Sequence, residues 1–586
     1  TAYGFERNPF TSQHTISAAY YFATNGFDLA YSGEFANVVG EANLMIKGRL
    51  TSPNYSVNFF GYGNDTSNPE ADGDADLDYN RVKLSTLGFE SSLIWRGDLG
   101  SKTQFGLSYE SIEIEKSKSH SNKRMQFKLI QSKYEFKNDW FKNINKELNQ
   151  FSEKEYNFLK PLVIEKSIPE IQTSILDGKL TYEKLVLFYL YRIKSIEYDK
   201  NQYLNSIISI NQNIVKEARE KDKRKPESIY SLHGIPVLLK DNINFEGLAT
   251  TAGSYALNNN TSKNAFVVDK LKENGALILG KTNLSEWAYY FCNNCPSGYS
   301  ALGGQTLNPY GRKIFDSGGS SSGSGVAISA NFSSVSLGSE TSGSILSPSS
   351  ASSIVGLKPT VGIVSRSGIV PISSTLDTSG PMTKNVIDNA IVLKAISSYD
   401  QNDSMSVNSK DIDLESILDS SLKGKRFGVF NELLNDSLYS NAINKIEKLG
   451  GIIIKFNPPQ INFNGFRKIL DYDMKNDLPI YFKNNNISFK SIKDIVEFNK
   501  KDSLNRAPYG QGIFKSIISD STKFNEISLI KTRIKTEGKK YFNTAIKKHK
   551  LDAIISINNY HAGYAAGAYY PCLTIPMGYN KNGKPF

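Results

Sequence analysis

The chain has 586 residues, of which 39% are hydrophobic, and carries a formal net charge of +11 at pH 7. This length is sufficient for several hydrophobic cores, and three cysteines are too few for a disulfide framework. Residues 1–115 hold 7 Lys+Arg against 15 Asp+Glu, a net of −8, whereas the remainder holds 62 against 43, a net of +19. Basic clusters such as residues 221–225 are typical of solvated helix surfaces. Nucleic acid is not expected as a partner, because the sequence has neither aromatic interleaving nor a recognisable binding module.

The first 115 residues have the pattern of short antiparallel strands. Apolar and polar residues alternate in six aromatic-rich segments, which are separated by Asn, Gly and Asp turns. The segments are HTISAAYYFA, FDLAYSGEF, EANLMIKGRL, YSVNFFGYG, RVKLSTLGFESSLIW and SKTQFGLSYESI. A period of two predicts an antiparallel all-β segment with one apolar face.

Residues 1–115 also resemble strands of a Gram-negative outer-membrane β-barrel of the surface-antigen type, although a soluble antiparallel sheet has the same alternation. A bacterial membrane barrel must close and has at least eight strands, more than the six segments found. No apolar run is long enough for a transmembrane helix, and the chain starts at Thr1 without a signal peptide. The resemblance therefore implies a barrel fragment, and a membrane is a partner only through this segment.

Residues 116–144 are expected to be a charged junction between this segment and a second domain at residues 145–586. The stretch IEIEKSKSHSNKRMQFKLIQSKYEF has no apolar period, which is typical of a linker or of a join between two genes. We favour the hypothesis that the fusion is not a working two-domain design. The same fusion found with both parts complete in an intact reading frame would contradict it.

From about residue 165 onward, helix signals alternate with short apolar runs. Ser167 followed by Glu170 predicts a capping box, and Thr181 opens a second helix. The apolar face of this second helix is formed by Leu185, Phe188, Tyr189 and Ile193. Runs such as ALILG and DAIISI are typical of buried strands. The predicted fold class is α/β, with a central mixed β-sheet covered by helices.

The segment HGIPVLLKDN predicts a buried strand that ends on Lys240. A lysine has a pKa of about 10.4 in water, and burial lowers it because the charged ammonium is disfavoured. A desolvated Lys240 is therefore a candidate base for a serine hydroxyl, which is a poor nucleophile without one.

Residues 316–359 form a serine- and glycine-rich tract in which Ser320 and Ser344 lie 24 positions apart. Such tracts are most often flexible linkers. Patterned apolar sequence flanks this one, however, and VAISAN continues it as a helix. With Lys240, the two serines indicate a Ser-Ser-Lys hydrolase that needs no histidine.

These motifs, in this order and spacing, resemble the amidase signature family. The resemblance covers LHGIPVLLKDNI, TTAGSYAL, LKENGALILGKTNLSEWA, SGYSALGGQTLNPYG, the serine-rich tract, SSTLDTSGPMT and YPCLTIPMGYNKNGKPF. The tract SGYSALGGQTLNPYG is more similar to peptide-amidase-type enzymes than to the amidase-like subunits of glutamyl-tRNA amidotransferases. Because the family continues beyond the position of Phe586, the second domain is expected to be C-terminally truncated.

The resemblance implies the fold of the family and a catalytic triad. Ser344 corresponds to the nucleophile, Ser320 to the bridging serine after a cis peptide bond, and Lys240 to the base. Ser321 corresponds to a supporting serine beside this proton relay. The expected reaction is hydrolysis of a carboxamide C–N bond, in a small amide or a peptide amide, through an acyl-enzyme. The triad is complete without a metal, so no cofactor is expected.

The resemblance also places an oxyanion hole in the turn before the nucleophile. Its donors are the backbone amides of Thr341, Ser342, Gly343 and Ser344, which would stabilise the oxyanion of the transition state. Position 342 is usually Asp or Gly in the family and is Ser here. If an aspartate side chain at position 342 normally anchors the turn, the serine loosens it. If only the backbone N–H of residue 342 binds the oxyanion, the change has little effect.

Several other residues are functional candidates. Lys281 also follows an apolar run and is the rival base, although the family pattern makes it part of the scaffold. Cys292 and Cys295 form a CxxC pair, which we interpret as free thiols in a loop near the pocket. Asp377 is expected to hold a turn. Two larger groups are the alternating Asp72, Asp74, Asp76 and Asp78, interpreted as a solvated loop rather than a calcium loop, and Tyr289, Tyr290 and Tyr299, which fit a pocket or a core equally well.

Three function classes follow: an amidase, an amidotransferase-type subunit on the same fold, and an outer-membrane barrel protein with a non-functional fused amidase fragment. The amidase is the favoured class, and residues 289–305 argue against the amidotransferase. A cytoplasmic or periplasmic location fits the amidase part, and the N-terminal segment is outer-membrane-like. The sequence leaves the compartment, the oligomeric state and the particular amide open.

Overall fold

The computed structural model describes residues 2–6, 13–21, 26–39, 42–52, 55–58, 81–96, 102–115, 140–418 and 421–586. The chain divides into two compact units, Thr1–Leu129 and Ile130–Phe586. The four alternating aspartates between residues 72 and 78 lie outside the described residues, so neither interpretation of them is tested.

The first unit contains an antiparallel sheet of seven described strands. They are β1 (Ala2–Glu6), β2 (Gln13–Tyr21), β3 (Gly26–Val39), β4 (Ala42–Thr51), β5 (Tyr55–Asn58), β6 (Arg81–Arg96) and β7 (Lys102–Glu115). Neighbours follow the order β1-β2-β3-β4-β6-β5, and β7 also pairs with β6. The alternating sequence thus forms an antiparallel segment, whereas its origin as a barrel fragment stays a prediction.

The two faces of this sheet differ in polarity. Leu29 lies opposite Leu50, which in turn lies opposite Leu87, so that large apolar side chains form a row across three strands. On the other face, Arg49 and Asp28 form a cross-strand ion pair of 2.9 Å. The period-two pattern of the sequence produces this segregation.

The second unit includes residues that the sequence analysis assigned to the junction. Trp140, Phe141 and Ile144, which the sequence placed in the junction, are buried in the main hydrophobic core. Trp140 also donates a hydrogen bond from Nε1 to the carbonyl oxygen of Ile208 (3.1 Å). The sequence did not predict this packing, because Trp140 and Phe141 are adjacent and do not follow the spacing of an amphipathic helix. The remaining domain boundaries stay predictions.

The second unit opens with a group of helices, two of which begin where the sequence predicts. They are α1 (Asn145–Gln150), α2 (Glu153–Val163), α3 (Ile168–Leu176), α4 (Tyr182–Glu197) and α5 (Ile214–Lys221). Ser167 and Glu170 form the capping box of α3, and the Thr181 side chain caps α4. The four apolar residues predicted to face the core from α4 are all buried.

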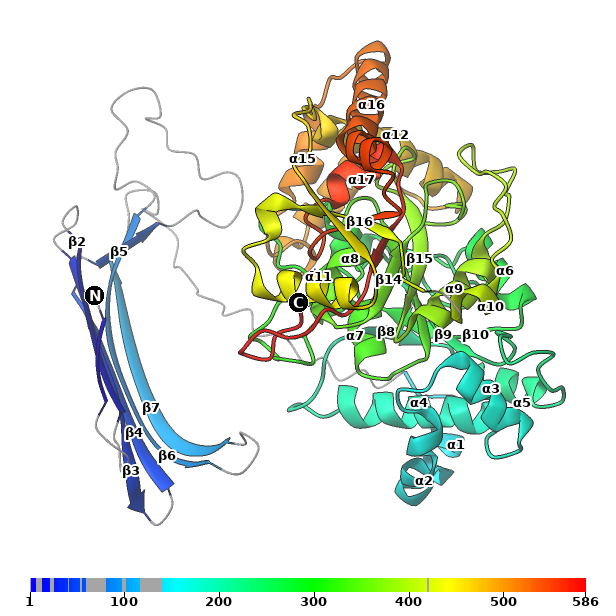
Figure 1. Cartoon of the computed structure of the whole chain (residues 1–586). Coiled ribbons are helices and arrows are strands. Elements are labelled where there is room, and N and C mark those ends of the chain that lie inside the picture. The colour runs from blue at the N-terminus through cyan, green and yellow to red at the C-terminus, as the bar shows by residue number, and fades with distance from the viewer. Residues whose placement is uncertain are drawn as a thin grey trace. The chain divides into compact units, whose positions relative to one another are not determined.

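A mixed sheet of seven described strands lies at the centre of the second unit (Figure 1). Its strands are β8 (Ile207–Ile210), β9 (Pro236–Lys240), β10 (Leu277–Thr282), β13 (Val335–Glu340), β14 (Val355–Lys358), β15 (Thr378–Thr383) and β19 (Cys572–Thr574). The order is β19-β14-β15-β13-β9-β10-β8, with β9 parallel to both β10 and β13 and the outer pairs antiparallel. The α/β fold with a mixed sheet is confirmed.

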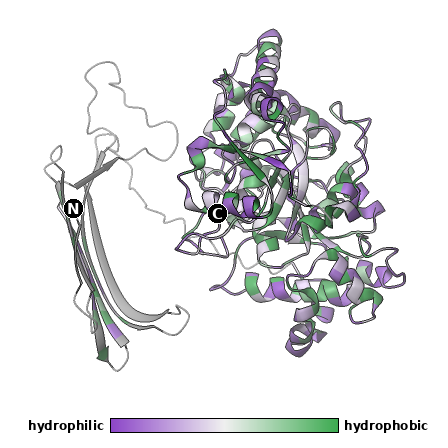
Figure 2. Ribbon diagram, viewed as in Figure 1, coloured by the Kyte–Doolittle hydropathy of each residue, from purple (hydrophilic) through white to green (hydrophobic). Residues whose placement is uncertain are grey.

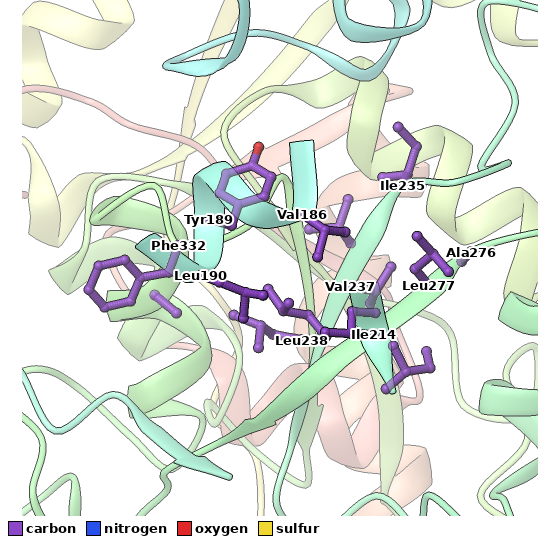
Figure 3. Packing of buried hydrophobic residues seen from close by; sticks show 14 of the residues in the cluster. Val186, Tyr189, Leu190, Ile214, Ile235, Val237, Leu238, Ala276, Leu277 and Phe332 are labelled. Atoms are coloured by element: carbon purple, nitrogen blue, oxygen red, sulfur yellow. The ribbon is translucent and has the colours of Figure 1, made fainter. Parts of the chain in front are cut away.

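Helix α4 covers the sheet through close apolar packing. Figure 3 shows Val186 and Leu190 of α4 beside Val237 and Leu238 of β9, with Phe332 close by. All five side chains are buried. Burying side chains of this size stabilises a fold by about 1.5–3 kcal/mol each relative to exposure. This packing fixes β9, the strand that ends on Lys240.

The other elements surround this sheet or form smaller sheets. The helices are α6 (Phe266–Glu273), α7 (Ser322–Ser329), α8 (Leu346–Ala351), α9 (Val386–Ile396), α10 (Leu414–Leu418), α11 (Ser437–Lys448), α12 (Phe466–Asn484), α13 (Ile492–Lys500), α14 (Ser503–Arg506), α15 (Gly512–Ser519), α16 (Phe524–His549) and α17 (Ala562–Ala568), with 3₁₀ turns η3 (Tyr255–Leu257), η4 (Glu286–Tyr289) and η5 (Asn431–Leu433). A parallel sheet joins β16 (Arg426–Phe430), β17 (Ile452–Phe456) and β18 (Ala553–Ile555), and a hairpin pairs β11 (Tyr299–Ser300) with β12 (Gly304–Gln305).

In Figure 2, hydrophobic colour gathers on the central strands of the second unit, and hydrophilic colour is common on its outer helices and loops. Helices α1–α5 lie together at one end of this unit, and α12, α15 and α16 lie at the opposite end (Figure 1). Among the described residues, no helix combines the length and the hydrophobicity that crossing a bilayer would require.

Candidate active site

Lys240 is the last residue of β9 and is fully buried, as the sequence predicts. Its Nζ donates to Ser320 Oγ at 2.7 Å, to Ser339 Oγ at 2.9 Å and to the carbonyl oxygen of Ser339 at 3.0 Å. Asn242 Nδ2 donates to the same Ser339 hydroxyl at 2.8 Å. The amine is therefore held against Ser320 by contacts on the neighbouring strand β13.

The surroundings of Lys240 favour the neutral amine. Burial lowers the pKa of Lys240 from its ordinary value to about 7, while the charges of Asp377 and Glu340 partly offset this effect. Within the described part of the chain, the hydrogen-bond partners of its Nζ are two hydroxyls and a carbonyl oxygen, and none is a carboxylate. A neutral amine has a lone pair that can accept a proton, so Lys240 can act as a base near neutral pH.

Ser320 is buried at the start of the turn that leads into α7. The Gly319–Ser320 peptide bond is cis, as expected. A Cβ added at Gly319 would stand 2.5 Å from Ser297 Oγ and 2.6 Å from Ser285 Oγ, so glycine is needed for this close approach. The carbonyl oxygen of Ser320 accepts a hydrogen bond from the Ser285 amide (3.0 Å).

Ser344 is half-buried in the turn between β13 and α8, where its carbonyl oxygen accepts a hydrogen bond from the Ser321 amide (3.0 Å). This backbone contact brings the turn of Ser344 beside the residue that follows Ser320. Within the described residues, the Ser344 hydroxyl forms no side-chain hydrogen bond with Ser320. Proton transfer from Ser344 to Ser320 therefore stays a prediction.

The turn of Ser344 is anchored by Glu340, a buried carboxylate that the sequence patterns did not single out. Its Oε1 accepts from the Gly343 amide at 2.6 Å, and its Oε2 accepts from the amides of Ile345 (2.7 Å) and Leu346 (3.0 Å). Charge-assisted bonds of this kind are roughly twice as strong as neutral ones. Glu340 thus fixes the backbone on both sides of Ser344.

The Gly343 amide does not have the predicted place in the oxyanion hole, because its N–H donates to Glu340. Gly343 has a φ of +102°, a conformation that favours glycine. A Cβ added there would stand 2.6 Å from Asn559 Nδ2. The amides of Thr341, Ser342 and Ser344 stay candidate donors to an oxyanion.

Ser321 supports Lys240 indirectly. Its Oγ donates to the carbonyl oxygen of Ser339 (3.1 Å) and accepts from the Ser339 amide (3.3 Å). The same carbonyl oxygen accepts from Lys240. Ser321 therefore positions the strand that holds the amine. Ser339 itself was missed, and only its place one residue before Glu340 in GSETSGSI could have drawn attention to it.

Asp377 holds a turn, as predicted, and also contacts Thr341 at the start of the Ser344 turn. Its Oδ2 accepts from the amides of Ile372 (2.8 Å) and Ser373 (2.9 Å), and its Oδ1 accepts from Thr341 Oγ1 (2.5 Å). Burial raises the pKa of this carboxyl, while its hydrogen bonds oppose the rise. Asp377 therefore fixes the Thr341 side chain at the start of the Ser344 turn.

Lys281, the rival base, forms an ion pair and two hydrogen bonds with other residues. Its Nζ lies 3.1 Å from Asp241 Oδ1 and donates to the Ile243 carbonyl oxygen (2.7 Å) and to Thr250 Oγ1 (2.8 Å). Both members of this ion pair are fully buried. Breaking a buried pair leaves an uncompensated charge, which is strongly destabilising. This geometry supports a scaffold role.

The loop after η4 corrects the interpretation of the CxxC pair, because Cys292 and Cys295 form a disulfide rather than free thiols. Spacing alone does not distinguish the two states. Of the three tyrosines near this loop, Tyr290 donates to Asp471 Oδ1 (2.6 Å) and Tyr299 packs edge-on against Tyr509. Tyr289 is 44% exposed and stays a candidate for the wall of a pocket.

Known proteins resemble the second unit in sequence and fold. The sequence profile of the family described as Amidase matches residues 184–559. A "probable amidase" of Arabidopsis thaliana is 34% identical over 443 residues, which cover 72% of this chain and 85% of the plant protein. A glutamyl-tRNA(Gln) amidotransferase subunit from Thermoanaerobacter pseudethanolicus is 37% identical over 309 residues, which cover 51% of this chain and 61% of that protein.

Two solved structures have the same fold. An amidase family protein from Bacillus anthracis aligns with a TM-score of 0.70 and 35% identity, covering 76% of this chain and 90% of that protein. The native peptide amidase from Stenotrophomonas maltophilia aligns with a TM-score of 0.66 and 34% identity, covering 72% of this chain and 92% of the enzyme.

Proposed function

This chain belongs to the amidase family and is a hydrolase that acts on amides, and we propose that it cleaves a carboxamide C–N bond with Ser344, Ser320 and Lys240. The observation that carries the proposal is the buried Lys240 Nζ at 2.7 Å from Ser320 Oγ. A buried lysine with a depressed pKa beside a serine hydroxyl is the arrangement that a histidine-free base requires.

The proton moves through Ser320. Neutral Lys240 donates its two N–H groups to Ser339 and directs its lone pair to the Ser320 hydroxyl. Lys240 takes the proton of Ser320 as Ser320 takes the proton of Ser344. The Ser344 oxygen then attacks the amide carbonyl carbon, forming a tetrahedral intermediate.

Collapse of the intermediate breaks the C–N bond. The proton on Lys240 returns through Ser320 to the leaving nitrogen, which departs as ammonia or an amine. Backbone amides of Thr341, Ser342 and Ser344 hold the oxyanion, and one such donor contributes roughly 2.7–4 kcal/mol to lowering a barrier of this kind. Water then attacks the acyl-enzyme by the same relay and releases the carboxylic acid.

The substrate class is a small carboxamide or a peptide amide. The likeness to the peptide amidase of Stenotrophomonas maltophilia over 92% of that enzyme supports a peptide amide. The three groups proposed to react all lie within one unit of the chain, Ile130–Phe586.

Fluorophosphonate labelling tests the mechanism, with mass spectrometry locating the label and ammonia release measuring turnover. We expect label on Ser344 in the natural chain and none in Ser344→Ala or Lys240→Met. Lys358→Met is the matched control, because Lys358 is equally buried but donates to the carbonyl oxygens of Pro359 and Tyr570. A folded Lys240→Met variant that still labels Ser344 would contradict the assigned base.

An amidotransferase-type role is the second candidate, favoured by the identity of 37% to the Thermoanaerobacter protein. That match spans only 51% of this chain, against 72% for the plant amidase. Glutamine-dependent transfer that needs a partner protein would support it, whereas ammonia release by the chain alone supports the amidase. The third class, a membrane barrel with a fused fragment, predicts heat-modifiable gel migration and detergent dependence.

A further inference from the structure

Asn559 lies beside the nucleophile turn, although it belongs to the loop between β18 and α17. A Cβ built on Gly343 would be 2.6 Å from Asn559 Nδ2 and 3.4 Å from Asn559 Cγ, so the carboxamide of Asn559 lies against the α-carbon of Gly343. Gly343 directly precedes Ser344. The Asn559 side chain therefore lies beside the backbone of the turn that carries Ser344.

The loop holds Asn559 in a defined position. The Asn559 carbonyl oxygen accepts from the Ala562 amide (3.0 Å) at the start of α17. Ser556 Oγ and His561 Nδ1 lie 2.6 Å apart and close the loop on both sides of Asn559. The His561 ring stacks on Phe430, with centroids 4.0 Å apart and an interplanar angle of 11°. These contacts reduce the entropy cost of presenting Asn559 to a ligand.

The carboxamide of Asn559 is available for binding. Asn559 is half-buried, and within the described residues its side-chain nitrogen and oxygen have no hydrogen-bond partner in the protein. A carboxamide offers two N–H donors and one acceptor oxygen, which match the carbonyl and N–H of another amide. The Gly343 amide faces Glu340, so it does not compete for the same ligand group.

We propose that Asn559 is a specificity-determining residue that binds a second amide group on the acyl side of the scissile carboxamide. The inference rests on the proposed function and narrows it to peptide-like amides, such as N-acylated amino acid amides. The backbone amides of the Ser344 turn are proposed to bind the scissile carbonyl oxygen. Asn559 therefore binds the next amide group on the acyl side of the substrate. A simple alkyl carboxamide has no such group.

Two substrates that differ in this group test the proposal: N-acetyl-phenylalanine amide and 3-phenylpropanamide. Both have a phenyl group and a primary carboxamide, but only the first has a second amide. Ammonia release gives kcat/KM for the full chain, for Asn559→Ala and for Asn558→Gly. Asn558 is the matched control because it is exposed in the same loop and has a φ of +48°, which glycine adopts readily.

We expect Asn559→Ala to lower kcat/KM roughly 10-fold or more for N-acetyl-phenylalanine amide and less than about 2-fold for 3-phenylpropanamide. Asn558→Gly is expected to change either value by less than about 2-fold. The rate at which a simple alkyl fluorophosphonate, which contains no amide, labels Ser344 should not change in Asn559→Ala.

Equal losses on both substrates, no loss on either, or slower labelling would overturn the proposal, because they indicate a structural role or none. The proposal would also be overturned if the natural chain hydrolysed 3-phenylpropanamide but not N-acetyl-phenylalanine amide. A natural chain that neither labels Ser344 nor releases ammonia would instead contradict the proposed function, and the role of Asn559 with it.

Discussion

Ser339 Oγ lies 2.9 Å from Lys240 Nζ, which gives the buried amine a second side-chain partner besides Ser320. The Ser339 carbonyl oxygen is a third partner at 3.0 Å. When the amine is neutral, its two N–H groups donate to these two acceptors of Ser339, and its lone pair points to Ser320. Sequence position alone gave Ser339 no such role.

Ser339→Ala tests this orientation. We expect kcat to fall roughly 5-fold with little change in KM, because losing one hydrogen bond of about 1 kcal/mol lets the amine rotate away from Ser320. Steady-state kinetics on N-acetyl-phenylalanine amide measure both constants. A rise in KM at constant kcat would contradict the assignment, since it would place Ser339 in substrate binding.

The pH profile of kcat/KM tests Lys240 as the base. Because the base must be neutral and burial lowers its pKa to about 7, kcat/KM should rise with pH through about 7 and level off above it. The charge of Asp377 opposes the effect of burial on this pKa. Asp377→Asn should therefore move the midpoint to lower pH. A midpoint that moves upward would contradict this electrostatic coupling.

The same lysine makes stability depend on pH. Between about pH 7 and pH 10 an unfolded chain binds a proton on Lys240 that the folded chain does not, so the free energy of unfolding rises with pH. The natural chain should gain about 1.4 kcal/mol per pH unit relative to Lys240→Met over this range. Urea unfolding of both proteins at several pH values measures the difference. A difference independent of pH would show that Lys240 keeps an ordinary pKa.

Glu340→Gln tests the anchor of the nucleophile turn. A glutamine side chain has one acceptor oxygen, whereas the carboxylate of Glu340 has two. At least one of the three backbone N–H groups that Glu340 binds therefore loses its acceptor. We expect a loss of about 1–3 kcal/mol in stability and slower fluorophosphonate labelling of Ser344. Glu273→Gln is the control, because Glu273 is exposed on α6. Normal labelling in a folded Glu340→Gln protein would show that the turn does not need this anchor.

The Cys292–Cys295 disulfide is expected to stabilise the loop that precedes Ser297. Closing such a short loop contributes about 2 kcal/mol in the chain-entropy description. The Cys292→Ser/Cys295→Ser double variant should lower the free energy of unfolding by this amount, and reductant should have the same effect on the natural chain. Cys572→Ser, which removes a thiol that is free in the structure, should not. Equal stability with and without reductant would show that the pair contributes nothing.

Local patterns were sufficient to predict individual elements of the fold. The capping box of Ser167 and Glu170 and the buried strand ending on Lys240 were predicted correctly, because both depend on residues a few positions apart. The cis peptide bond before Ser320 was implied by the family resemblance alone, and the structure has it between Gly319 and Ser320. The resemblance then named the three groups that we propose to react.

The partners of those groups depended on the tertiary structure. Strands β9 and β13 are parallel, with Leu239 opposite Leu337, so their carboxyl ends meet and bring Ser339 beside Lys240. Asn559 reaches Gly343 from more than 200 positions away. The CxxC interpretation was wrong because cysteine pairing depends on the distance between the two residues, here 5.6 Å between Cα atoms.

The sequence by itself therefore determined which residues can do chemistry, since side-chain type and strand period are local properties. Only the tertiary structure decided that Glu340 binds the Gly343 amide, that Asp241 pairs with Lys281, and that Lys240 is buried against the hydroxyls of Ser320 and Ser339. The physical reason is that burial and pairing set the charge of an ionisable group, and both are properties of contacts between distant segments.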